Sequence, residues 1–161
     1  MKILIIRFSS LGDIVLTSPV PRLIKKRFPS SEVHFLTKKN YSETYINNIN
    51  ISKVYLLDEN FFELYKKLKK NNYDLIIDLH NNIRSFFLRK LLGVKSLVYN
   101  KNRLKRWLIV NLKLKVKIPH IVDSYIKTLS SMNIKNDNKG LDYFLVKNDF
   151  KFLNLLPSLI P

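Results

Sequence analysis

The sequence predicts an α/β fold in which helices cover both faces of a parallel sheet. Short, nearly continuous apolar segments alternate along the chain with longer segments of helical periodicity, as in parallel strands joined by crossover helices. The chain has 161 residues, of which 46% are hydrophobic and 12% aromatic. This length suits one domain with a real core, and the composition argues against disorder.

Five apolar segments are the strand candidates. Each is apolar at almost every position, which is typical of strands that helices cover on both faces. They span Lys2–Arg7, Glu32–Thr37, Lys53–Leu57, Leu75–Leu79 and Ser96–Tyr99, and Leu141–Val146 is a weaker candidate after a loop at residues 133–140.

The first helix is predicted over Ile14–Phe28. Its last turn carries three cations, Lys25–Arg27, which complement the C-terminal end of the helix dipole, and Pro29 ends it. Pro19 and Pro21 cannot both lie comfortably in a helix interior. We therefore expect the first turns of this helix to be irregular or kinked.

Three more helices follow. The segment Asn60–Asn71 is amphipathic, as a helix on the surface of a sheet should be. The segment Ile83–Leu92 is followed by Gly93, which suits a left-handed C-terminal cap. The last helix is predicted over His120–Met132, with Tyr125 among its inward-facing residues.

The chain is strongly basic and contains no cysteine. Its 29 Lys and Arg against 12 Asp and Glu give a net charge of +17, which predicts an anionic partner: nucleic acid, an acidic membrane surface or a phosphorylated substrate. Abundant Lys, Asn and Ile also fit an AT-rich genome. Without cysteine, disulfides and thiolate catalysis are excluded. His34, His80 and His120 lack metal-ligand spacing, so we expect neither a metal nor a cofactor.

A basic tract, Lys101–Lys117, has two interpretations. It is either an interfacial segment on anionic lipid with Trp107 at headgroup level, or a solvated helix face followed by a Lys-protected edge strand, Leu112–Lys117. No segment approaches the roughly 18 to 20 consecutive apolar residues of a membrane-spanning helix, so we expect a soluble or peripheral protein. No recognised nucleic-acid motif is present, and no nucleic-acid partner is expected.

Two polar loops follow predicted strands. In the first, the small residues Ser9, Ser10 and Gly12 let a ligand approach the backbone, and Asp13 can cap the next helix or accept a proton. The second loop contains His80, Asn81, Asn82 and Arg84, and it lies on the same rim if both strands are parallel. Alternatively, Asp78 and His80 are satisfied strand-end polar groups and Arg84 is solvated.

Three segments, in this order, carry a family pattern. They are Lys-Ile-Leu-Ile-Ile-Arg-Phe-Ser-Ser-Leu-Gly-Asp-Ile-Val-Leu-Thr-Ser-Pro at residues 2–19, Asp-Leu-Ile-Ile-Asp-Leu-His-Asn-Asn-Ile-Arg-Ser at residues 74–85, and His-Ile-Val-Asp-Ser-Tyr at residues 120–125. Together they resemble the heptosyltransferases of glycosyltransferase family 9. The resemblance implies metal-free transfer of a heptose from a nucleotide sugar, ADP-heptose in the well-known members, to the lipopolysaccharide inner core.

The resemblance also implies a two-domain GT-B fold with two Rossmann-like domains. The chain matches the amino-terminal half, with residues 1–150 as the acceptor-binding domain and residues 151–161 as the start of the linker. We expect ADP-heptose to be held through a second domain that is missing from this chain. The chain alone should therefore be inactive. The expected acceptor is a phosphorylated, lipid-linked saccharide, and the expected location is the cytoplasm, at the inner face of the inner membrane.

Carried over by position, the resemblance makes Asp13 the general base. The other residues that it implies bind substrate: Arg7 and Arg84 at anionic groups of the acceptor, Ser9, Ser10 and Gly12 along the cleft, and His80 and Asn81 nearby. Two alternatives remain at this point, a non-catalytic anion-binding remnant and a basic nucleic-acid-binding α/β module.

Overall fold

The computed structural model describes residues 1–57, 60–101 and 120–144. Its centre is a five-stranded sheet in the order β3-β2-β1-β4-β5, and every neighbouring pair is parallel. The strands are β1 (Lys2–Ile6), β2 (Glu32–Thr37), β3 (Lys53–Leu56), β4 (Leu75–Asp78) and β5 (Ser96–Val98). The predicted parallel α/β fold is therefore confirmed, with each strand within one residue of its expected bounds.

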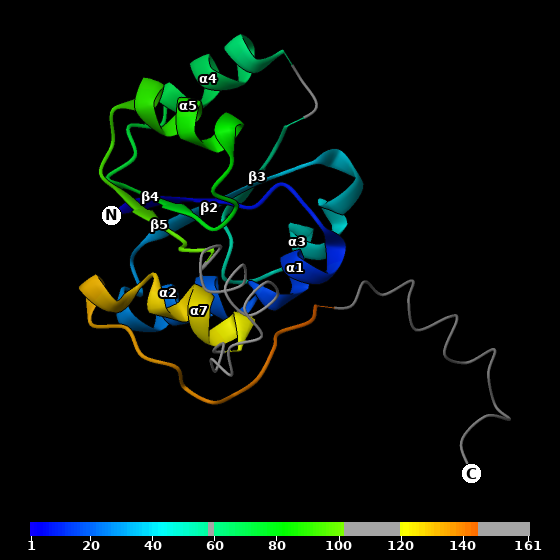
Figure 1. Ribbon diagram of the computed structural model, residues 1–161, viewed down its shortest axis with the longest axis vertical. Coiled ribbons are helices and arrows are strands. Elements are labelled where there is room, and N and C mark those ends of the chain that lie inside the picture. The colour runs from blue at the N-terminus through cyan, green and yellow to red at the C-terminus, as the bar shows by residue number, and fades with distance from the viewer. Residues whose placement is uncertain (58–59, 102–119, 145–161) are drawn as a thin grey trace, which may run out of the picture.

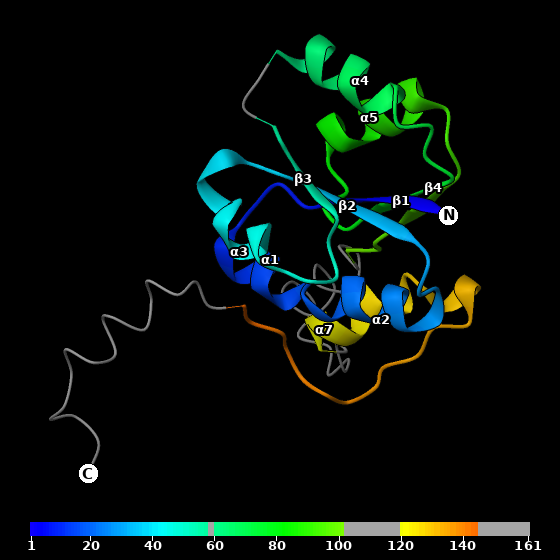
Figure 2. The ribbon, with the colours of Figure 1, turned by 180° about the vertical axis from the view of Figure 1, so that it is seen from behind.

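Helices cover both faces of this sheet (Figures 1 and 2). Strand β1 shows why: Ile3 and Ile5 pack in one apolar cluster and Leu4 and Ile6 in another, because successive side chains of a strand point to opposite faces. The first cluster lies under α1 (Leu11–Leu16), α2 (Pro19–Arg27) and α7 (Ile121–Lys127), and the second under α4 (Phe61–Lys69) and α5 (Ile83–Leu92).

The strand order reverses at β1. The chain runs outward through β2 and β3 on one side of β1, and then returns to place β4 and β5 on the other. In open parallel sheets the carboxyl ends of the strands at this reversal form the crevice where ligands bind. The loops after β1 and β4 therefore meet at the position most suited to a functional site.

The helix predicted over Ile14–Phe28 is two helices. The first begins earlier, at Leu11, and ends at Leu16, while the second begins at Pro19. Proline is tolerated at a first helical position because its missing N–H has no partner there in any helix. The predicted irregularity is present, but it separates α1 from α2 at Thr17 and Ser18 instead of fraying the first turn.

The remaining helices differ from prediction mainly at their ends. Helix α5 has the predicted bounds and is closed by Gly93 at φ 67°. Helix α7 ends at Lys127 and is followed by a 3-10 turn, Ser130–Met132. The short helix α3 (Glu43–Ile46) and a preceding 3-10 turn (Lys39–Tyr41) were not predicted.

The predicted strand Leu141–Val146 is wrong for its described part. Residues 141–144 form no strand, and Asp142 is held by α2 and its N-terminal flank: it pairs with Arg22, and its N–H donates to Ser18 Oγ at 2.9 Å. The rest of that prediction, and the basic tract beyond Lys101, lie outside the described residues. Across the ranges that are described, no helix has both the length and the apolar character to cross a bilayer.

Candidate functional site

Arg7 ties together the strand ends at the reversal of the sheet. It directly follows β1, its backbone N–H donates to Leu36 O of β2 at 3.0 Å, and its Nη1 donates to Leu79 O after β4 at 2.6 Å. Only 7% of the residue is exposed. A guanidinium buried this deeply needs a countercharge, since an unpaired buried charge is strongly destabilising.

Asp13 supplies that countercharge. Its Oδ2 lies 2.6 Å from Arg7 Nη2 and accepts from the Ser10 hydroxyl at 3.0 Å and the Ser10 N–H at 3.4 Å. Its other oxygen, Oδ1, accepts one long hydrogen bond, 3.4 Å from the Tyr125 hydroxyl. With the side chain 34% exposed, Oδ1 is the oxygen available to a ligand.

The carboxyl group of Asp13 is held ionised. Burial raises its pKa, but the charge of Arg7 and the hydrogen bonds from Ser10 and Arg7 together lower the pKa by more than burial raises it. The pKa of Asp13 therefore lies below its ordinary value. The N-cap of α1 is Ser10, and Asp13 is the third residue of that helix. The capping and proton-accepting roles that the sequence left open are therefore compatible, one on each oxygen.

Tyr125 is the site residue that sequence reasoning did not single out. It comes from α7 and is fully buried. Its ring contacts the ring of Tyr99 and the guanidinium of Arg7. Burial raises its pKa, so the hydroxyl stays protonated and can only donate to a carboxylate. Two signals were available, its inward position on a predicted helix and its place in the family segment at residues 120–125, although 112 residues separate it from Asp13.

The small residues of the first loop leave α1 open to solvent. Ser9 is half-buried, and Ser10 and Gly12 are exposed. A Cβ added at Gly12 would meet nothing within 4 Å. Space for a ligand therefore exists over the first turn of α1, next to Asp13.

His80 lies beside Arg7 and is neutral. Its ring is half-buried against Phe8, with ring centroids 4.8 Å apart. Burial and the positive charges of Arg7 and Lys101 lower its pKa to about 4. A neutral imidazole next to the carboxylate can exchange hydrogen bonds with a sugar without adding a charge.

Asp78 and Asn81 shape the second loop. Asp78 is fully buried, its Oδ1 accepts the N–H groups of His80 and Asn81 at 3.0 and 2.8 Å, and its Oδ2 lies 2.9 Å from Arg89. Asn81 adopts φ 47° and donates its side-chain N–H to Tyr99 O at 2.9 Å. These contacts favour the structural interpretation of Asp78, and they engage one N–H of the Asn81 amide that was predicted to bind substrate.

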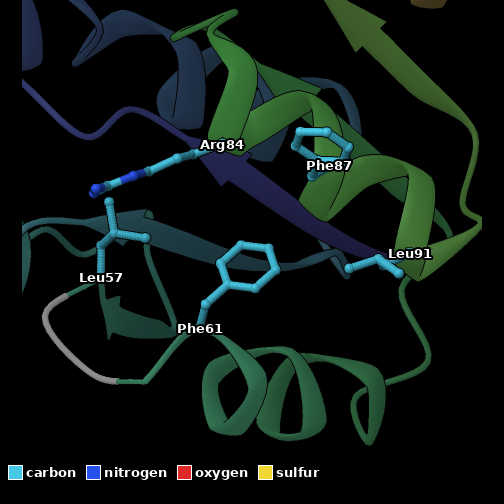
Figure 3. Close-up of a pocket in the computed structure, with 5 residues that line it drawn as sticks. All are labelled: Leu57, Phe61, Arg84, Phe87 and Leu91. Carbon is cyan, nitrogen blue, oxygen red and sulfur yellow. The ribbon is translucent and has the colours of Figure 1, made fainter.

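Arg84 lies at the same edge of the sheet as Asp13 but over the other face. It is exposed in the first turn of α5, whereas Asp13 belongs to α1. A groove of about 460 Å³ includes Arg84, and Figure 3 shows its side chain extending toward Leu57 while Phe61 and Phe87 face each other behind it. Within the described chain, neither Asp13 nor Arg7 lines this groove.

The site is not built as a metal centre in the ranges the structure describes. No three carboxylates or imidazoles there are grouped as ligands. The arrangement instead offers an ionised carboxylate with one accessible oxygen, fixed by a buried cation at the ligand-binding edge of a parallel sheet. Such a group can accept a proton from a bound hydroxyl.

Known proteins are similar to this chain in sequence and in fold. Lipopolysaccharide heptosyltransferase 1 of Campylobacter coli is 32% identical over 111 residues, which are 65% of this chain and 32% of that protein. Among solved structures, glycosyl transferase family 9 from Veillonella parvula superposes with a TM-score of 0.73 at 19% identity, over 91% of this chain and 46% of the other.

A second solved structure is the E. coli heptosyltransferase WaaC with ADP-2-deoxy-2-fluoro heptose. Its TM-score is 0.67 at 18% identity, and the match covers 98% of this chain and 56% of that chain. The chain spans about a third of the length of two curated relatives that it matches and about half of the length of these solved structures. Its fold is thus the Rossmann-like half expected of a GT-B protein.

A family model supports the same relationship over a defined segment of the chain. The model of glycosyltransferase family 9 (heptosyltransferase) matches residues 61–151, more than half of the chain. This segment includes the second polar loop and α7, while the relative from Campylobacter coli is similar over a comparable length. The chain therefore belongs to glycosyltransferase family 9, the heptosyltransferase family.

Proposed function

We propose that this chain is the acceptor-binding, base-bearing half of a heptosyltransferase that transfers heptose from ADP-heptose to the lipopolysaccharide inner core. The observation that carries the proposal is the Asp13 carboxylate, ionised by Arg7 and open at Oδ1 on the ligand-binding edge of the sheet. Membership of the family and the ADP-heptose analogue bound by the E. coli relative support the choice of donor.

In the proposed reaction Asp13 acts as general base. The oxygen of the acceptor hydroxyl bonds to the anomeric carbon, the bond from that carbon to the diphosphate oxygen breaks, and ADP leaves with the bonding electrons. Asp13 Oδ1 takes the hydroxyl proton as the oxygen becomes acidic in the transition state, which contributes on the order of 10² to 10⁴ in rate. Arg7 positions the carboxylate and keeps it charged, since its Nη1 donates to Leu79 O and its Nη2 pairs with Asp13 Oδ2.

The remaining site residues would contact the acceptor. The open surface beside Asp13 is bordered by Ser9, Ser10 and Gly12. Neutral His80 lies near this surface, because its ring packs on Phe8 and is close enough to Arg7 for that charge to lower its pKa. The exposed guanidinium of Arg84 is free of the constraints on Arg7 and suits a phosphate or carboxylate of the acceptor. This assigns acceptor recognition to residues 1–150, with residues 151–161 leading toward a donor-binding domain.

The same proposal places the protein in the cytoplasm at the inner face of the inner membrane, where a lipid-linked acceptor would be reached. The basic tract Lys101–Lys117 would then meet anionic headgroups. A net charge of +17 supports attraction to such a surface.

The test measures heptose transfer by the chain completed with a donor-binding domain. We expect Asp13→Ala and Asp13→Asn to lower kcat by about 10² to 10⁴ with little change in the KM for ADP-heptose. Glu43→Ala, which removes an exposed carboxyl group on α3, is the matched control and should retain activity within about twofold.

Two results contradict the proposal in different ways. Turnover retained by both Asp13 variants would remove the base and leave Asp13 a structural partner of Arg7. Absence of transfer by the unsubstituted completed chain, with anion binding intact, would support the alternative of a non-catalytic remnant.

A further inference from the structure

The outer side of α5 carries more large apolar side chains than a solvent-facing helix surface requires. Toward the sheet α5 buries Ser85 and Leu88. Away from it stand Ile83, Phe86, Phe87 and Leu91, with Ile83 71% and Phe87 53% exposed. A surface helix normally shows the opposite distribution, so this side is built to meet something apolar.

The apolar residues form one continuous surface with α4. Ile83, Phe87 and Leu91 recur every four residues and therefore lie on one line along α5. Phe87 and Leu91 also line the groove that Phe61 and Leu57 close from the opposite side (Figure 3). Together with exposed Phe62, these residues make up the docking face: Leu57, Phe61, Phe62, Ile83, Phe86, Phe87 and Leu91.

Cations surround the docking face. Helices α4 and α5 together contain one acidic residue, Glu63, against six cations. Arg89 pairs with buried Asp78, and the other five are exposed: Lys66, Lys67, Lys69, Arg84 and Lys90. Several lie directly on its rings, since Lys66 Nζ is 4.5 Å from the centroid of Phe62 and Lys90 Nζ is 5.9 Å from that of Phe86. The partner must therefore accept apolar side chains and supply negative charge around them.

We propose that the docking face binds the surface of an anionic lipid bilayer. Aromatic and aliphatic side chains enter the boundary between headgroups and acyl chains, while Lys and Arg remain at headgroup level. Helix α5 would lie in the plane of the interface with Ile83, Phe87 and Leu91 downward. The docking face shares no residue with the basic tract Lys101–Lys117, and binding does not depend on the proposed sugar transfer.

The orientation fits the position of the candidate site. Leu57 directly follows β3, and Arg84 lies in the first turn of α5 after β4, so one end of the docking face lies at the carboxyl edge of the sheet. Asp13 lies at the same edge over the other face. A bilayer on the docking face would thus present lipid-linked molecules beside the edge that carries the carboxylate.

The test measures binding of the 161-residue chain to vesicles of phosphatidylcholine alone and of phosphatidylcholine with phosphatidylglycerol at about a third of the lipid. The chain should cosediment with the anionic vesicles and only weakly with the neutral ones. Phe87→Ser with Leu91→Ser should lower the partition coefficient about tenfold. The matched control, Ile46→Ser with Ile49→Ser, removes two apolar residues outside the face that are even more exposed, and it should change the coefficient less than about twofold.

Charge is tested in the same way with two double variants that have the same net charge as each other. Lys66→Glu with Lys90→Glu should weaken anionic-vesicle binding by about tenfold or more, whereas Lys127→Glu with Lys135→Glu, on α7 and the loop after it, should weaken it far less. Equal losses in both pairs would overturn the proposal, because attraction would then reflect the overall charge of +17 alone.

Insertion itself is read from a fluorescent probe in place of Phe87. Phe87→Trp should be quenched by lipids brominated in the acyl chains, and Ile49→Trp should not, while Trp107 contributes the same background to both. Equal quenching would contradict insertion of the docking face. Loss of self-association, without loss of vesicle binding, in Phe87→Ser with Leu91→Ser would show that a second copy of the chain covers the face instead.

Discussion

Arg7 and Asp13 act as one unit at the scale of residues. The guanidinium is buried and the carboxylate is its main countercharge, so removal of either leaves the other in an unfavourable state. Within the pair, the atom that remains available to a ligand is Asp13 Oδ1. The pair thus combines a structural tie between strand ends with a group that can accept a proton.

The pH dependence of stability tests this pairing. The pKa of Asp13 in the folded chain is below its ordinary value of 3.8, so its charged form stabilises the fold above that value, and this stabilisation is lost as the pH falls through the lowered pKa. Asp13→Asn should unfold more easily by about 1 kcal/mol at neutral pH, discounted because the side chain is partly exposed. The difference should close in acid, as followed by urea unfolding across a pH series.

A matched variant defines the background for this measurement. Glu43→Gln changes an exposed carboxyl group on α3 and should unfold like the parent chain throughout the series, within a few tenths of a kcal/mol. A gap between the parent and Asp13→Asn that stayed constant from neutral to acid pH would show that the carboxylate charge is not what stabilises the site.

His80 should remain neutral over most of the pH range. Its pKa in the folded chain is about 4 against an ordinary value of 6.5, so the unfolded chain binds more protons between these values. The fold should lose stability as the pH falls through that window, and His80→Gln should lose less. Ring-proton shifts in NMR give the value directly, and titration of His80 near 6.5 would be incompatible with its burial against Phe8.

At the scale of elements, two glycines should respond oppositely to alanine. Gly93 closes α5 at φ 67°, where a Cβ is strained, so Gly93→Ala should destabilise the fold by about 1 kcal/mol. Gly12 lies inside α1 with open space around it, so Gly12→Ala should stabilise by up to about 1 kcal/mol. Urea unfolding of the two variants measures both effects, and a loss of stability at Gly12 would mean that its conformation demands glycine.

The elements that the sequence predicted well have strong local signals. Strand β2 and helix α5 agree with prediction at both ends, because a buried apolar run and a glycine cap define them without reference to the rest of the chain. The start of α1 was missed because Ser10–Gly12 was interpreted as a turn, while the hydrogen bonds from Ser10 to Asp13 extend the helix back to Leu11. Helix α3 is too short to show a period.

The candidate site was predictable only in part. Asp13 and its loop follow from the strand-turn-helix pattern and the family resemblance, whereas Tyr125 reaches the carboxylate through tertiary packing. Arg7 was predicted to bind the acceptor, and that stays a prediction. The sequence could not show that its side chain is buried and contacts Leu79 and Asp13. The helical periodicity of the sequence also could not reveal that the side of α5 facing away from the sheet is the more apolar one.

At the scale of the whole molecule, the order of strands decides which loops cooperate. Because β1 separates β2 from β4, the loops after β1 and β4 meet at the reversal of the sheet, although more than 60 residues separate Arg7 from Leu79. Helices α4 and α5 occupy the opposite face from α1 and α7 (Figures 1 and 2). The carboxyl edge of the sheet is thus available to the proposed acceptor, while the outer side of α4 and α5 is available to the proposed bilayer.

The proposal that this chain forms the acceptor half of a substrate cleft has a direct consequence for the 161-residue chain on its own. Transfer requires the hydroxyl and the anomeric carbon to be aligned with water excluded, which one domain alone does not provide. We therefore expect no turnover from this chain and a preference for the acceptor over the donor.

Calorimetry of the purified chain against ADP-heptose and against a phosphorylated inner-core saccharide measures that preference most directly. Both titrations need matched ionic strength, because a net charge of +17 attracts any anion weakly. The saccharide should bind more tightly than ADP-heptose, and Arg84→Ala should weaken its binding. Tight, saturable binding of ADP-heptose, or measurable transfer by the chain alone, would contradict the assignment of this chain to the acceptor.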